Sequence, residues 1–386
     1  MIKTLDRRTV IRALIVFVVG AALLTIAQIA VGDSAAAAPA AGTETAIAQA
    51  ADAAAGSADL TDVEDPSVVE EDPGSPNPSG TTSRPLQLLF NGIIFGLLLA
   101  LASVGLSLIY GTTGLSNFAH GEQVSFGAVL TYFLTTQQPV GLPFIPNDFV
   151  IGLPLIPAAL IAVAVSAFTG WLQDKYLWSP LRRKRAAMVQ QMIVSIGLSL
   201  ALLNLLQWWI GGRRLRLTTA IDERWTIGPI VVGRTALFSG LIAIVCLLGV
   251  SFFLLRTRLG RATRAVADNP SLAAASGIKV DSIVRLVWII AAGLAGLGGI
   301  LLGLYDQGTA FDAGARMLLL MFAAVTLGGL GQAFGALAGS LVIGIVVEMS
   351  SLWLSTDLKI ATALIILIGV LLVRPQGILG RAERVG

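Results

Sequence analysis

The stretch "LLFNGIIFGLLLALASVGLSLIYGTTGLSNFAHGEQVSFGAVLTYF", residues 88–133, consists of two apolar runs separated by a short polar break. Each run approaches the length needed to cross the roughly 30 Å of hydrocarbon in a bilayer. The break, "GLSNFAHGEQ" at 114–123, holds Asn117, Glu122 and His120, the only histidine of the chain. Polar groups at membrane depth are costly and gather at functional sites. The stretch therefore predicts a membrane helix that is interrupted at a functional site.

The composition extends this prediction to most of the chain. Of 386 residues, 55% are hydrophobic and only 13% are charged, whereas a soluble domain carries about 25% charged residues. The apolar runs do not alternate, which favours helices over a β-barrel. We expect an all-α, polytopic membrane bundle of about eight to nine transmembrane segments, some of them broken or short. The expected segments are 86–110, 119–137, 150–170, 187–211, 236–256, 286–305, 316–330, 334–349 and 358–373.

The N-terminal part has a different character. Residues 1–32 combine a basic start, a long apolar run and small residues, a pattern typical of either a signal peptide or an uncleaved signal anchor. Residues 33–84 are acidic and rich in Ala and Pro, and they hold too few large apolar groups to form a core. We predict a disordered extracytoplasmic segment there, followed by the membrane domain over 85–380.

Basic loops predict the orientation of the bundle. The loops 171–186 and 256–285 and the C-terminus are rich in Lys and Arg, so they belong on the cytoplasmic side. One loop, 212–235, disagrees with this assignment, because it is basic yet is counted as extracytoplasmic. Its basic residues are Arg213, Arg214, Arg216, Arg224 and Arg234. No internal repeat is evident along the chain.

A glycine-rich turn joins the two short segments before the last. In "LGGLGQAFGALAGS", residues 327–340, the pathway candidates are Gly328, Gly329 and Gly331. Short, glycine-interrupted apolar segments are typical of transporter helices that line a pathway, although a helical hairpin packed through small residues has the same pattern. Glu348 ends the second segment, either as a further pathway candidate or as a helix-end residue that reaches the interface.

The longest inside loop, 257–285, contains the start and stop signals of a short helix. In "DNPSLAAASG", Asn269 is suited to the N-cap, Pro270 to the first turn and Gly277 to the C-cap. Leu272, Ala275 and Ile278 would share one apolar face. The segment is either a docking element for a cytosolic partner or an ordinary arginine-rich loop.

Several functions are excluded or unsupported by the residues present. One histidine and one cysteine, Cys246, cannot form a common zinc site, and the chain has no phosphate-binding loop of the G-x-x-x-x-G-K-[ST] type. Ser195 and Ser199 lie in an apolar segment without a basic partner and are interpreted as packing residues. We therefore expect that the chain is not an enzyme and that it has no cofactor, no metal site and no nucleic-acid partner.

Four stretches resemble one family, the permease subunits of branched-chain amino acid (Liv-type) ATP-binding-cassette importers. They are "YGTTGLSNFAHGE" (110–122), "RATRAVADNPSLAAASGI" (261–278), "LGGLGQAFGALAGSLVIGIVVE" (327–348) and "VRPQGILG" (373–380). Their order and spacing fit the family over about 86–380. The turn "GQAFGA" departs from it, since Ser-Ile-Pro is common there.

The resemblance implies a multi-pass subunit of the bacterial inner membrane. Its partners would be a second, similar permease, two cytosolic ATPases and an extracytoplasmic solute-binding protein that delivers a small solute. The short helix would be the element that couples to an ATPase, with the residues Arg261, Arg264, Asp268, Asn269, Pro270, Leu272, Ala275, Gly277 and Ile278. Two alternatives stay open: a permease for urea or short amides, and an ion-coupled transporter that works alone.

Overall fold

The computed structural model describes residues 83–136, 151–218, 222–354, 358–373 and 377–378. The expected leader and almost all of the acidic segment lie outside the described residues, as does most of "VRPQGILG". Predictions about those parts of the chain therefore stay predictions.

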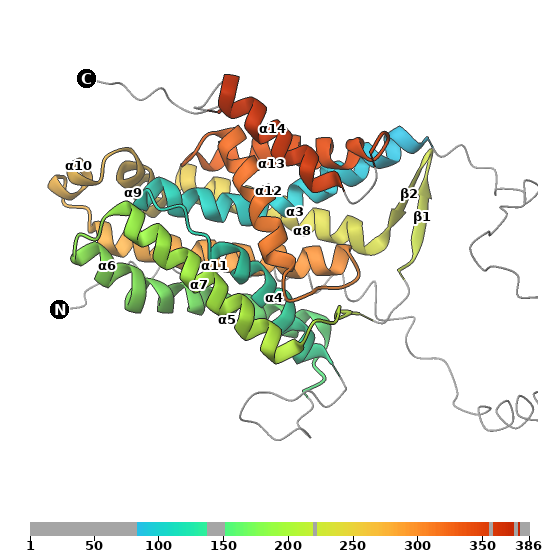
Figure 1. The fold of residues 1–386 in the computed structure, drawn as a ribbon, viewed down its shortest axis with the longest axis horizontal. Helices are drawn as coiled ribbons and strands as arrows, with labels where there is room; N and C mark the ends of the chain where they lie inside the picture. The colour runs from blue at the N-terminus through green and yellow to red at the C-terminus, as the bar shows by residue number, and fades with distance from the viewer. Residues whose placement is uncertain (1–82, 137–150, 219–221, 355–357, 374–376, 379–386) are drawn as a thin grey trace, which may run out of the picture. The chain divides into compact units, whose positions relative to one another are not determined.

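The described residues fold mainly into helices (Figure 1). The helices are α3 (Arg84–Thr113), α4 (His120–Thr135), α5 (Leu155–Gln173), η2 (Asp174–Trp178), α6 (Ser179–Arg183), α7 (Met188–Ile210), α8 (Arg234–Arg256), α9 (Arg258–Asp268), α10 (Pro270–Ala275), α11 (Val280–Tyr305), α12 (Ala313–Gly328), α13 (Ala333–Ser350) and α14 (Lys359–Val373). Each of the nine expected membrane segments coincides with one helix, so the all-α membrane fold is confirmed. By length and hydropathy, 6 stretches of the described chain could cross a bilayer alone, and α12 and most of α14 are shorter apolar helices.

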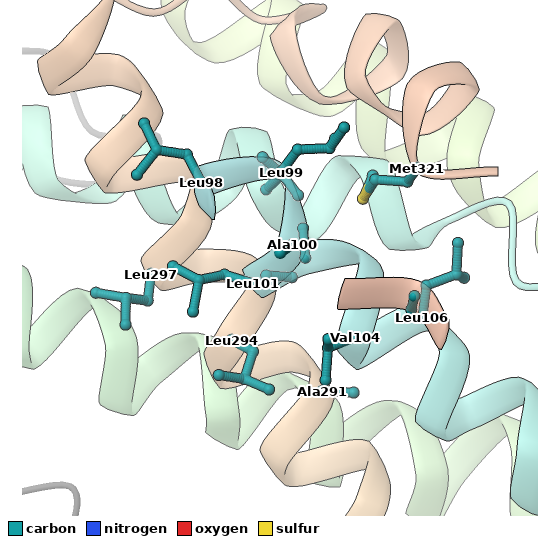
Figure 2. Packing of buried hydrophobic residues seen from close by; sticks show 14 of the residues in the cluster. Leu98, Leu99, Ala100, Leu101, Val104, Leu106, Ala291, Leu294, Leu297 and Met321 are labelled. Carbon is teal, nitrogen blue, oxygen red and sulfur yellow. The ribbon is translucent and has the colours of Figure 1, made fainter. Parts of the chain in front are cut away.

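Helices α3 and α11 form the centre of the bundle. Apart from their first turns they are apolar on every side, as a helix surrounded by others must be. The Cβ of an alanine at Gly105 would lie 2.9 Å from the carbonyl oxygen of Ala291, and one at Gly298 would lie 3.5 Å from that of Leu98. Residue numbers thus rise along α3 as they fall along α11, so the two helices run antiparallel. Figure 2 shows the side chains packed around it.

Two halves of the bundle repeat the same arrangement in opposite directions. In the first half α3 ends, the irregular segment 114–119 follows and α4 begins. In the second half α11 ends, the segment 306–312 follows and α12 begins. α4 and α12 each have 16 residues. Phe118-x-x-Gly121 and Phe311-x-x-Gly314 occupy the same places in the two halves. The next helix of each half packs on the long helix of the other, α5 on α11 and α13 on α3. No repeat is evident in the sequence because the halves share so few residues that only the structure reveals it.

The basic elements and an unexpected hairpin lie at opposite ends of the helices. α6, α9 and α10 lie at one end (Figure 1), which agrees with a cytoplasmic position for both basic loops. At the other end, β1 (Arg224–Ile227) pairs with β2 (Ile230–Gly233), a small antiparallel exception to the all-α prediction. Two arginines of this outer loop bond to the chain itself: Arg234 to Glu223 at 3.1 Å, and Arg214 to the carbonyl oxygen of Asp306 at 2.7 Å. Arg214 and Arg234 thus have a structural role within the loop, which explains their presence without placing the loop on the cytoplasmic side.

Candidate translocation pathway

The polar break of the opening stretch returns the chain to the middle of the bundle. α3 ends at Thr113 with Gly114 in the left-handed conformation (φ 71°), and α4 begins only at His120. The Nε2 of His120 donates to the carbonyl oxygen of Ala102 at 3.0 Å. Ala102 lies about 16 Å from the C-terminal end of α3 and about 27 Å from its start, at 1.5 Å per residue. The helix is therefore interrupted as predicted, and α4 starts deep inside the bundle.

The polar side chains of the break bond to several partners. Asn117 accepts a hydrogen bond from the backbone N–H of Ala119 at 3.2 Å, while its Nδ2 is buried and has no partner in the part of the chain that the structure describes. The Ser195 hydroxyl of α7 accepts from the N–H of Phe118 at 3.3 Å. Ser195 therefore holds the break in place, and its interpretation as a packing residue is wrong.

Glu122 is buried, with 1% of its surface exposed. Its Oε1 accepts a hydrogen bond from the Ser199 hydroxyl at 3.2 Å, and its Oε2 has no partner within the described chain. The interpretation of Ser199 as a packing residue is therefore wrong as well. His120 and Glu122 thus bond to different partners, the carbonyl oxygen of Ala102 and the hydroxyl of Ser199.

The first turns of α4 and α12 meet at one point, which we call the mid-bundle crossing. A Cβ on Gly121 would lie 2.6 Å from the carbonyl oxygen of Gly314, so neither helix has room for a side chain here. The Ser125 hydroxyl accepts from the N–H of Gly314 at 2.7 Å. Two helix N-termini, each with a partial positive charge, therefore lie together at the centre of the bundle.

An ion pair that the sequence analysis did not identify lies beside the crossing. Arg316 of α12 donates from Nε and Nη2 to Oδ2 of Asp312, at 2.9 Å and 2.6 Å. Glu122 follows Gly121 and Asp312 lies two residues before Gly314, so both carboxylates belong to the segments that meet at the crossing. The crossing thus gathers three ionisable side chains from α4 and α12 and the residues before them.

The glycine turn is a tight reversal at the far end of α12. Gly329 and Gly331 have φ values of 111° and 77°, which only glycine adopts without strain. Gly328 packs against Gly335 across the turn, and Gly331 packs against Gly111 at the end of α3. The N–H of Ile378 donates to the carbonyl oxygen of Leu327 at 2.7 Å, so the C-terminal segment also contacts this turn.

Glu348 lies away from the mid-bundle crossing. It forms an ion pair with Lys359 at 3.0 Å, which joins the end of α13 to the start of α14. This geometry supports the helix-end interpretation of Glu348 over the pathway interpretation.

The predicted short helix is present as α10. The side chain of Asn269 accepts from the N–H of Leu272, and Gly277 has a φ of 84°. Ala273 is buried, whereas Leu272 is 65% exposed. Ala275 is exposed, and Arg261 and Arg264 are exposed on the neighbouring α9. α10 therefore presents an apolar residue to its surroundings beside positive charge.

Together these features define a multi-pass membrane protein with paired interrupted helices and a polar centre, the architecture of a transporter subunit. Within the described residues, no group of three or more His, Cys, Asp or Glu side chains could hold a metal ion.

Comparison with known proteins gives the family. Residues 88–373 match the model of the branched-chain amino acid transport system / permease component family. The chain is 32% identical over 313 residues to the high-affinity branched-chain amino acid transport system permease protein LivH of Escherichia coli strain K12, covering 77% of this chain and 96% of that protein. It is 30% identical to the corresponding permease protein BraD of Pseudomonas aeruginosa, with the same coverage. No solved structure matches. The chain belongs to this permease family.

Proposed function

We propose that this protein is the membrane-spanning permease subunit of an ATP-binding-cassette importer for branched-chain amino acids, located in the bacterial cell membrane. Family membership over nearly the whole described bundle carries the proposal. The interrupted helices support it, because a protein that only anchored others would gain nothing from breaks that place polar groups at its centre.

Transport by this subunit requires partners. A permease of this kind pairs with a second permease and with two cytosolic ATPases, and it receives solute from an extracytoplasmic binding protein. ATP hydrolysis belongs to the ATPases, since this chain has no phosphate-binding loop. We assign α10 to ATPase docking, because it is capped at its N-terminus and exposes Leu272 at the cytoplasmic end.

The test is to purify the complex from native membranes, identify its subunits and measure solute uptake in proteoliposomes. We expect two ATPases to co-purify, and uptake of leucine to require ATP and the binding protein. Uptake of urea or short amides in place of leucine would contradict the proposed solute. Ion-driven uptake by this chain alone would contradict the proposed class of transporter.

A further inference from the structure

One face of α12 carries charge where the bundle is otherwise apolar. The side chain of Arg316 is 66% exposed and that of Asp312 is 25% exposed. One turn further along α12, Leu319 is 46% exposed. Phe322 follows on the same side and contacts Phe118 of the break, with ring centroids 5.2 Å apart. We call Asp312, Arg316, Leu319 and Phe322 the ion-pair face.

The ion-pair face begins at the middle of the membrane. The two halves run in opposite directions, so the axis that relates them lies in the membrane plane. Gly121 and Gly314 are equivalent residues in contact, which places them on that axis and at mid-depth. Arg316 is two residues beyond Gly314, or about 3 Å along the helix. It lies about 18 Å from the C-terminal end of α12, too far for its head group to reach the inner interface.

An arginine exposed to hydrocarbon at this depth costs at least about 3 kcal/mol. Ion pairing to Asp312 reduces that cost, but both side chains would still be better solvated by water. The ion-pair face is therefore expected to line a water-filled cavity. In an importer built from two permeases, the natural cavity is the translocation path between them.

The charges of this face match an amino acid. Arg316 uses two of its five N–H donors on Asp312, which leaves three free in the geometry that suits a carboxylate. Glu122 contributes a buried carboxylate oxygen that has no partner within the described residues, and Asp312 adds a second carboxylate near the same crossing. Leu319, Phe118 and Phe322 supply apolar surface next to the charges.

We propose that the ion-pair face is a solute site within the membrane. Arg316 receives the α-carboxylate, Glu122 and Asp312 receive the α-ammonium, and Leu319 with the Phe118–Phe322 pair receives the branched side chain. The site would thus select a zwitterion with an apolar side chain after the binding protein releases it. The inference rests on the proposed function and specifies which atoms of the solute the permease recognises.

Water access to the face tests the first step. In a Cys246→Ser background, Arg316→Cys and, with the charges intact, Leu319→Cys are treated in the assembled complex with a charged, membrane-impermeant methanethiosulfonate reagent. The control is Leu248→Cys on α8, an apolar residue that is 63% exposed. We expect the α12 positions to react at least about tenfold faster, because only a hydrated thiol forms thiolate. Equal, slow rates would mean that the face is covered by lipid or by the second permease, and would overturn the proposal.

Charge substitution tests the second step. At saturating loaded binding protein, Arg316→Met is expected to lower ATP-driven leucine uptake at least about tenfold, as the loss of a charge-assisted bond implies. Arg316→Lys should retain more uptake than Arg316→Met, and Arg224→Met in the outer hairpin should match wild type. If the wild-type complex imports leucine and Arg316→Met does so equally well, this inference alone fails. If the wild-type complex does not import leucine, the proposed function itself fails.

Discussion

At the scale of single residues, the polar groups of the break attach α4 to its neighbours. The opening stretch was enough to predict that Asn117, His120 and Glu122 lie where a membrane helix is interrupted, because their cost in an apolar region is visible from composition. Their partners could not be predicted. Ser195 and Ser199 lie far along the chain on α7, and a serine that packs cannot be told from one that bonds until the helices are placed.

His120 provides the first prediction. Its donor to Ala102 is the group that matters, so His120→Gln, which keeps an N–H donor, should change the free energy of unfolding by less than about 1 kcal/mol. His120→Leu should cost about 1–3 kcal/mol, because it removes a buried hydrogen bond. Thermal unfolding of the detergent-solubilised complex measures both variants. Parallel uptake assays separate the roles: loss of transport in His120→Gln at normal stability would favour gating over positioning.

Asp174 provides the second prediction. It is fully buried and accepts from Arg182 at 2.6 Å and Arg285 at 3.2 Å, which ties η2 to α6 and α11. Asp174→Asn should destabilise the protein by about 1–3 kcal/mol, because the side chain loses its charge and one of its two accepting oxygens becomes an NH2 that cannot accept from a guanidinium group. Asp281→Asn, an exposed carboxylate on α11, is the matched control and should cost no more than about 1 kcal/mol. Equal effects of the two variants would show that the Asp174 ion pairs contribute nothing.

At the scale of elements, the sequence predicts the positions of the helices better than it predicts the contacts between them. Apolar runs and caps located the nine membrane segments and α10, since hydropathy and capping are local properties. The π-helical turn η2 and the hairpin of β1 and β2 were not expected. Their formation depends on tertiary contacts, such as the two hydrogen bonds between the Gln87 side chain of α3 and Val231 of β2, at 2.8 Å and 2.9 Å.

The mid-bundle crossing gives a prediction at this scale. Gly121→Ala places a methyl group 2.6 Å from the carbonyl oxygen of Gly314, so α4 and α12 must separate. We expect a loss of about 1–3 kcal/mol in stability, together with reduced transport. Gly197→Ala on α7 is the control, because nothing lies within 4 Å of the added atom. Unfolding temperatures that fall equally in both variants would contradict the close crossing.

At the scale of the whole molecule, the inverted arrangement of the two halves could not be seen in the sequence. Phe118-x-x-Gly121 and Phe311-x-x-Gly314 are the local trace of it, but two shared residues do not define a repeat. Inverted repeats are also common in ion-coupled transporters, so the arrangement does not separate that alternative from an ATP-driven importer. The choice of an ATP-driven importer now rests on family membership and on α10.

The coupling of α10 to ATP hydrolysis is therefore the central claim to test. Leu272→Asp places a charge on an exposed residue, so the permease should still fold while the apolar contact with an ATPase is lost. In the reconstituted complex, we expect ATP-driven leucine uptake to fall at least about tenfold, with basal ATP hydrolysis retained. Leu272→Met, which keeps the apolar surface, should transport normally. Full ATP-driven uptake by Leu272→Asp, or by a variant that lacks Ser271–Ser276, would contradict the account.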